Sequence, residues 1–180
     1  LGYYNLKDYN NAMSDLNSSL AASPQFTEAL DLRGLVYMAQ KMFTEAINDF
    51  TNAINSNPEF AVSYLNRGIA EKLKKQYAQA VEDLDKAINI NPALLEAYYQ
   101  RGVAKMMIGT MGPALEDLNF YIENVTDRAG AYIARGLAYY QEGKYAEAAA
   151  DLEQGVQFNP GLAKDFNNII EYSKINAGQK

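Results

Sequence analysis

The sequence of 180 residues contains neither cysteine nor histidine. Without cysteine no disulfide or thiolate site can form, and the usual zinc ligands and the commonest general base are also missing. No apolar run approaches the length of about 20 residues that spans a bilayer. The net charge is −6, and an acidic chain repels phosphate backbones, which disfavours a nucleic-acid partner. The residues therefore indicate no metal, no cofactor and no catalytic site.

What the sequence does contain is an exact internal repeat. The dipeptide Arg-Gly recurs every 34 residues, at Arg33, Arg67, Arg101 and Arg135 and the glycine that follows each. Other columns keep the same period, among them the alanines Ala12, Ala46, Ala80, Ala114 and Ala148 and the prolines Pro24, Pro58, Pro92 and Pro160. A fixed period of this size is typical of repeat arrays, in which each unit buries its apolar face against its neighbours.

Each repeat is predicted to consist of two helices. Apolar residues spaced by three and four indicate a first helix over about 28–40 and a second over about 44–56 in the first full copy. Proline ends each second helix, and the turn between helices lies near Lys41, Lys75, Gly109 and Gly143. Glycine inside a helix costs about 1 kcal/mol relative to alanine. The glycines of the Arg-Gly pairs, Gly34, Gly68, Gly102 and Gly136, lie inside the first helices. We therefore expect the partner helix that carries the alanine to approach each of these four glycines closely.

The columns resemble those of the tetratricopeptide repeat family over about residues 1–162. The resemblance rests on Leu30, Tyr64, Tyr98 and Tyr132, each followed four residues later by glycine, and on the alanine, leucine or phenylalanine and proline columns. It implies an all-α, right-handed superhelical solenoid of helix-turn-helix repeats with a C-terminal capping helix. The related pentatricopeptide family, which binds RNA, usually has a period nearer 35, so period and acidity both argue against it.

The expected organisation is a partial N-terminal repeat, four full repeats and a cap. The partial repeat is 1–26, the full repeats are 27–60, 61–94, 95–128 and 129–162, and the capping helix and tail are 163–180. The repeat 95–128 is irregular. It has Tyr121 where a small residue is expected, Thr126 in place of proline, and Pro113 in the first turn of its second helix. Tyr121 predicts either a wider gap between helices or a ring that swings outward.

Every full repeat carries an arginine on its first helix and an aspartate 16 residues later on its second. The pairs are Arg33 with Asp49, Arg67 with Asp83, Arg101 with Asp117, and Arg135 with Asp151. In an antiparallel helical hairpin the two positions lie at similar heights, so we expect structural, bidentate salt bridges. An arginine ladder that binds an anion or an acidic partner is the alternative.

The family resemblance also implies a concave groove, lined by the first helices, that holds an extended peptide or a helix of another protein. The predicted lining is Asp31, Leu35, Met38, Leu65, Asn66, Ile69, Lys72, Tyr99, Gln100, Val103, Met106, Ile133, Leu137 and Tyr140. Leu35, Ile69, Val103 and Leu137 have the alternative role of packing neighbouring first helices together. Asn66 fits one position of the carboxylate clamp that some family members use, but Asp31, Glu96 and Gln100 do not.

These observations favour a non-enzymatic interaction scaffold or adaptor whose partner is another protein or a peptide segment. The chain begins inside a repeat, so we expect it to be part of a larger protein, which could be enzymatic or take part in an assembly. Self-association is a further alternative. Met13, Leu16 and Leu20 lie on the helix of the incomplete repeat, where they would be exposed and could pair two copies into a homo-oligomer.

Overall fold

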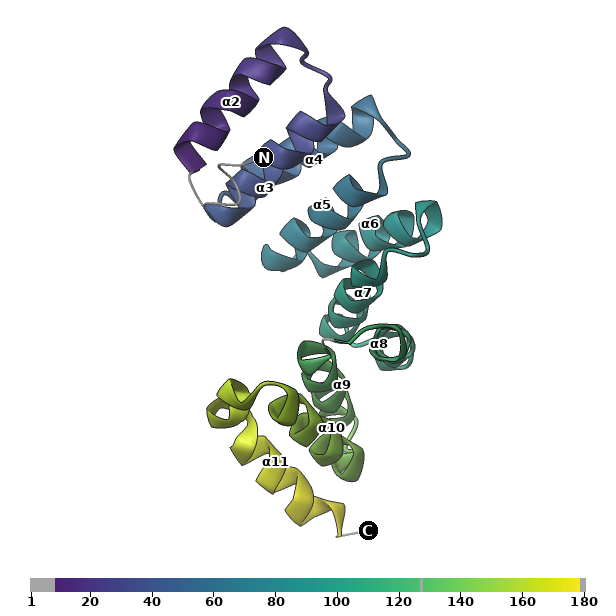
Figure 1. The fold of residues 1–180 in the computed structure, drawn as a ribbon. Helices are drawn as coiled ribbons and strands as arrows, with labels where there is room; N and C mark the ends of the chain where they lie inside the picture. The colour runs from purple at the N-terminus through teal and green to yellow at the C-terminus, as the bar shows by residue number, and fades with distance from the viewer. Residues whose placement is uncertain (1–8, 127, 179–180) are drawn as a thin grey trace. The chain divides into compact units, whose positions relative to one another are not determined.

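The computed structural model describes residues 9–126 and 128–178, and all of its regular elements are helices (Figure 1). Residues 1–8 of the predicted partial repeat, residue 127 of the irregular repeat and residues 179–180 of the predicted tail lie outside the described residues. Successive helices pair into antiparallel hairpins, as the repeat pattern predicts. The elements are α2 (Tyr9–Ala22), α3 (Thr27–Ala39), α4 (Phe43–Ser56), α5 (Ala61–Leu73), α6 (Tyr77–Ile90), α7 (Leu95–Met107), α8 (Met111–Asn124), α9 (Ala129–Gln141), α10 (Tyr145–Phe158), the 3-10 turn η1 (Pro160–Leu162) and α11 (Ala163–Ala177).

The helices form two compact units, residues 1–97 and 98–180. In the first unit α3 packs against α4 and α5 against α6, with α2 against α3 and α4 against α5 joining the hairpins. In the second unit α9 packs against α10, α8 against α9, and α11 against α10. Within each unit the helices pack in sequence order, which confirms the predicted helical-repeat fold.

The turns and helix ends follow the sequence signals. The residue between the two helices of each hairpin has a left-handed backbone, with φ of 62° at Lys41 and Lys75, 83° at Gly109 and 71° at Gly143. Each second helix that precedes a proline ends two residues before it, as α4 does at Ser56. The predicted helix over 28–40 is α3, which begins and ends one residue earlier.

The glycine column marks close contact between the helices of a hairpin. A Cβ atom placed on Gly102 would lie 2.9 Å from Cγ of Leu118 and 3.1 Å from the carbonyl oxygen of Ala114. Gly68 and Gly136 meet a leucine in the same way, and Gly34 meets the ring of Phe50. The prediction named the correct helix, but the nearest side chain belongs to the residue four positions after the alanine. That residue is fully buried in each repeat, as Leu118 is.

The irregular repeat differs where the sequence indicated. The ring of Tyr121 is half-buried and packs on Tyr99, with ring centroids 5.1 Å apart. It therefore contributes to packing inside the second unit instead of swinging into solvent. Pro113 is the third residue of α8, within its first turn, where no intrahelical N–H bond is lost.

Helix α2 does not expose the apolar residues on which self-association was predicted. Leu20 is 7% exposed and packs with Ala29, Leu30 and Ala53, and Leu16 packs against the same cluster. Met13 is half-buried. The expectation of exposure is wrong for Leu20 and holds only in part for the other two, because α3 and α4 cover this face.

Candidate functional site

The four arginines of the repeat column each form a two-pronged salt bridge with the aspartate 16 residues later. In the first, Nε of Arg33 donates to Oδ2 of Asp49 at 2.7 Å and Nη2 to Oδ1 at 2.8 Å. The corresponding pairs of distances are 2.5 and 2.7 Å for Arg67, 2.8 and 2.6 Å for Arg101, and 2.6 and 2.8 Å for Arg135. The hydrogen bond to aspartate raises the pKa of Arg33, Arg67 and Arg135. Charge-assisted pairs of this geometry tie the two helices of a hairpin together.

The remaining guanidinium nitrogen reaches back to the preceding hairpin. Nη1 of Arg33 donates to Oδ1 of Asn17 at 2.9 Å, and Nη1 of Arg67 donates to Oγ1 of Thr51 at 3.0 Å. Nη1 of Arg135 donates to Oδ1 of Asn119 at 2.6 Å. Arg67 and Arg135 also lie 5.7 and 5.3 Å from the ring centroids of Tyr64 and Tyr132. Because these groups are engaged in joining three helices, the structural role fits the column better than an anion-binding ladder does.

A buried polar network joins α3 to α5 in the first unit. Oδ1 of Asp31 accepts hydrogen bonds from Oγ of Ser63 at 2.7 Å and from Nδ2 of Asn66 at 3.1 Å. Burial raises the pKa of Asp31, although both hydrogen bonds lower it. Asn66 is 8% exposed, so its amide holds two helices together and is not presented to a partner. The predicted groove and clamp positions of Asn66 and Asp31 therefore lie inside the protein.

The other groove residues of the first unit are mostly packed. Leu35 and Met38 lie against the cluster of Ala46, Phe50 and Ala70, and Leu65 is buried. Ile69 and Lys72 are half-buried. Burial lowers the pKa of Lys72, and the nearby charge of Glu96 opposes that shift. For Leu35 the structure thus fits the alternative role of packing between helices.

In the second unit the predicted residues come together around an apolar hollow of about 290 Å³. Its lining is Tyr99, Val103, Met106, Gly130, Ile133, Ala134, Leu137, Leu162 and Phe166. Five of these, Tyr99, Val103, Met106, Ile133 and Leu137, were predicted for the groove, and none of the nine carries a charge. Gln100, also predicted, is buried and does not line the hollow. Tyr140 lies instead in a cluster with Tyr145 and Tyr172, with ring centroids 5.7 to 5.8 Å apart.

Two small residues on α9 leave this space open. Gly130 and Ala134 stand where the preceding repeat has Glu96 and Gln100, and where the repeat before that has Val62 and Asn66. A Cβ on Gly130 would lie 3.0 Å from the hydroxyl oxygen of Tyr99, so the tyrosine lies directly over the glycine. The sequence reasoning missed both residues. The signal that would have found them is a change from large to small within a repeat column.

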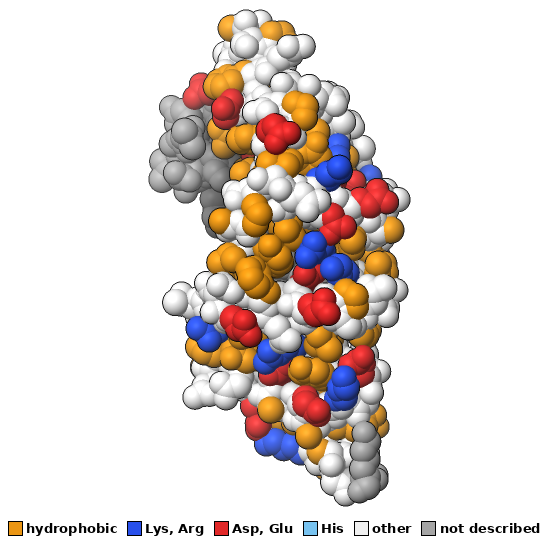
Figure 2. All heavy atoms as spheres, turned by 90° about the vertical axis from the view of Figure 1, so that its right-hand side faces the viewer, with side chains coloured by type: hydrophobic (Ala, Val, Ile, Leu, Met, Phe, Trp, Pro, Cys, Tyr) orange, Lys and Arg blue, Asp and Glu red, His pale blue; other side chains and the backbone are white. Residues whose placement is uncertain are grey.

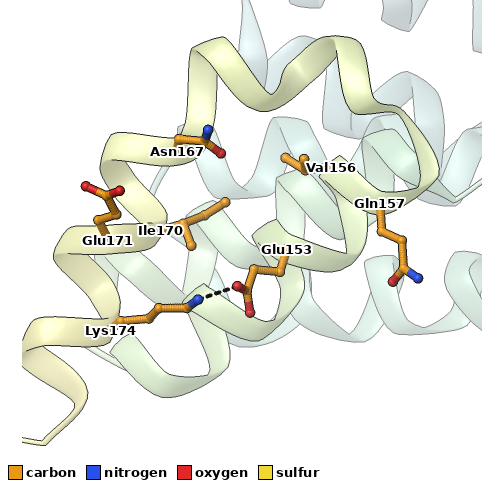
Figure 3. Close-up of a pocket in the computed structure, with 7 residues that line it drawn as sticks. All are labelled: Glu153, Val156, Gln157, Asn167, Ile170, Glu171 and Lys174. Carbon is orange, nitrogen blue, oxygen red and sulfur yellow. Dashed lines mark ion pairs between the residues drawn. The ribbon is translucent and has the colours of Figure 1, made fainter.

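A larger hollow of about 420 Å³ lies between α10 and α11 (Figure 3). Val156 and Ile170 face it, and an ion pair between Lys174 and Glu153 crosses one side. Glu153 occupies the column of Asn17, Thr51 and Asn119, but the residue 16 positions later is Ile169 and not arginine. Both partners of the ion pair are about half exposed, at 55% and 47%, so it contributes about 0–1 kcal/mol. We regard this hollow as part of the cap.

Within residues 9–126 and 128–178, no group of three or more acidic side chains is placed to hold a metal ion. None of the helices in this part of the chain is long and apolar enough to cross a membrane. On the face that Figure 2 shows, acidic and basic side chains are interspersed with apolar ones and do not gather by sign.

Comparison with known proteins identifies the repeats. A TPR repeat model matches residues 70–109, and tetratricopeptide repeat models match 27–60 and 129–162. The chain belongs to the tetratricopeptide repeat family. Proteins of this family are in general interaction modules that bind other proteins or peptides and carry out no catalysis. No curated protein sequence matches the chain.

Solved structures share the fold at low sequence identity. The crystal structure of MamA is 24% identical with a TM-score of 0.78, and the match covers 91% of this chain and 95% of that one. YrrB, described as a TPR protein with an unusual peptide-binding site, is 20% identical with a TM-score of 0.76, covering 96% and 86%. PilF of Pseudomonas aeruginosa is 18% identical with a TM-score of 0.76, covering 99% and 87%.

Proposed function

We propose that the chain is a non-enzymatic scaffold that holds an apolar or mixed segment of another protein. The observation that carries the proposal is the uncharged hollow between Tyr99 and Phe166 in the second unit. Its volume of about 290 Å³ is at the small end of the range for ligand pockets. Large apolar side chains of a peptide fit such a space better than a charged small molecule does.

The chemistry of the lining favours a protein segment. Tyr99 offers a large ring with one hydrogen-bonding group, and Met106 has a side chain that adapts its shape. Both properties suit a surface that receives side chains of varied outline. YrrB, which has the same fold, is described as having a peptide-binding site, and this likeness supports the proposal by analogy of fold.

Two glycine substitutions test the proposal with a matched control. Gly130→Glu places a carboxylate at the rim of the hollow. Two other repeats already have glutamate at the equivalent position, as Glu96 and Glu28. Gly112→Glu makes the same change on α8, where no atom lies within 4 Å of the added Cβ. Both replacements remove a glycine from a helix, so neither should lower stability through helix propensity.

The measurement is selection of short peptides from a displayed library on the full chain, followed by binding of the selected peptides to each variant. We expect selected peptides to carry bulky apolar side chains, and Gly130→Glu to weaken them by at least about tenfold, or 1.4 kcal/mol. Gly112→Glu should bind as the unchanged chain does. Equal binding by both variants would show that the hollow is not the binding site.

A further inference from the structure

One position of the repeat varies in charge next to the constant arginine. The residue four positions after each arginine is Tyr37, Glu71, Lys105 or Tyr139. In the second unit Nζ of Lys105 lies 3.0 Å from Oδ2 of Asp117, so a cation strengthens the arginine–aspartate pair there. At the equivalent place in the first unit, Glu71 puts a second carboxyl group beside Asp83.

The carboxyl groups of Glu71 and Asp83 both lie near the guanidinium of Arg67 and compete for it. Asp83 accepts from Nε and Nη2 of Arg67, and Nη1 of Arg67 donates to Thr51 of α4. Among the described residues, Oε2 of Glu71 is buried and has no hydrogen-bond partner. An unpaired buried acceptor is costly, and an ionised one is more so.

The charges acting on Glu71 come from the two helices of its own hairpin. From α5 it faces Arg67, and from α6 it faces Asp83 and Glu82. Thr51, which α4 contributes beside Arg67, is neutral. Burial, followed by the charge of Asp83, raises the pKa of Glu71 from 4.5 to about 7, although Arg67 opposes the shift. A protonated Glu71 can donate a hydrogen bond to Asp83, whereas an ionised Glu71 repels it.

We propose that a proton held between Glu71 and Asp83 fastens α5 to α6, and that its loss to solvent loosens this hairpin. The device is independent of the peptide site in the second unit. Through this proton, the local stability of the repeat 61–94 would fall as the pH rises through neutrality. Ile69 and Lys72, predicted groove residues on the same helix as Glu71, would become more mobile as the hairpin loosens.

The direction of the pH effect follows from linkage. Glu71 has a higher pKa in the folded state than the 4.5 of a free glutamate. Its contribution to stability is therefore complete below about pH 4.5 and is lost as the pH rises through about 7. Most acidic groups with a native partner behave in the opposite way, because their pKa falls on folding.

Hydrogen exchange on the full chain tests the proposal. Protection of amides in α5 and α6 is compared at about pH 5.5 and about pH 8.5, after correction for the intrinsic exchange rate. We expect protection in the unchanged chain to fall by about tenfold at the higher pH. Glu71→Gln, whose amide can donate to Asp83 at any pH, should keep its protection. The control Glu45→Gln, at an exposed position of α4 that does not act on Glu71, should behave as the unchanged chain does.

Two outcomes would overturn the proposal. One is protection of α5 and α6 that does not change with pH in the unchanged chain, and the other is an equal loss in Glu71→Gln. If Glu71→Gln fails to fold, carbon-13 titration of the Glu71 carboxyl group by NMR decides the question. A midpoint near 7 supports the device, and a midpoint near 4.5 rejects it.

Discussion

Removing Asp151 gives the most direct measure of what an arginine–aspartate pair contributes. Asp151 is buried and accepts two hydrogen bonds from Arg135, whose side chain is 19% exposed. Loss of one partner of a buried pair costs about 3–5 kcal/mol, and loss of an exposed one about 0–1 kcal/mol. In Asp151→Ala the guanidinium keeps Asn119 and the ring of Tyr132 and retains some contact with water. We therefore expect a loss between these limits, about 2–3 kcal/mol.

The assay is urea unfolding of the full chain followed by helical circular dichroism. With a slope of about 2 kcal/mol per molar urea, the expected loss moves the transition of the second unit by about 1–1.5 M. The control is Glu147→Ala, which removes an exposed carboxylate one turn earlier on α10 and should stay within about 0.5 kcal/mol. Equal, small losses in both variants would refute a structural role for the pair and revive the alternative of an anion-binding ladder.

Five further substitutions can be measured in the same assay. Gly102→Val should cost about 1–3 kcal/mol because a leucine and a backbone carbonyl leave no room, whereas Gly112→Ala, in open space, should gain about 0.5–1 kcal/mol. Lys75→Gly should gain about 0.5 kcal/mol because φ is 62°, and Gly143→Ala should lose about 1 kcal/mol because φ is 71°. Ser173→Ala should be neutral or stabilising, because the fully buried hydroxyl has no hydrogen-bond partner among the described residues.

The fold could be predicted from the sequence because each structural requirement recurs at a fixed interval. Gly34 and its counterparts, the alanine column and the prolines each have one physical role, and that role is repeated in several hairpins. Helix ends were predicted to within about one residue because left-handed turns and prolines fix them locally. Burial of Leu20 was within reach of the same reasoning, because Leu20 occupies the column of Ile54, Ile88 and Ile122, which are all buried. The prediction failed because it treated the helix of the incomplete repeat as uncovered, whereas α3 packs against it.

The predicted groove shows where sequence reasoning stops. Spacing placed Asn66 and Leu65 on the same side of the first helices as Val103 and Tyr99. Spacing alone cannot say which residue of a helix face a neighbouring helix covers. In the first unit Ser63 and Asp31 draw Asn66 into a buried network. In the second unit small residues on α9 leave the corresponding space open. The change from large to small is visible in the sequence, but the hollow that results from it is visible only with the neighbouring helices in place.

Constant and varying columns therefore carry different information in this chain. The arginine, glycine and aspartate columns build nearly the same contacts in every full repeat, so they describe the scaffold and not its partner. Gly130 departs from its column on the face of the apolar hollow, and Glu71 places a carboxyl group beside the Arg67–Asp83 salt bridge where the other full repeats have tyrosine or lysine. Neither departure improves packing: one leaves space, and the other leaves a buried oxygen without a partner. Positions at which a repeat gives up stability relative to its own copies are the ones most consistent with function.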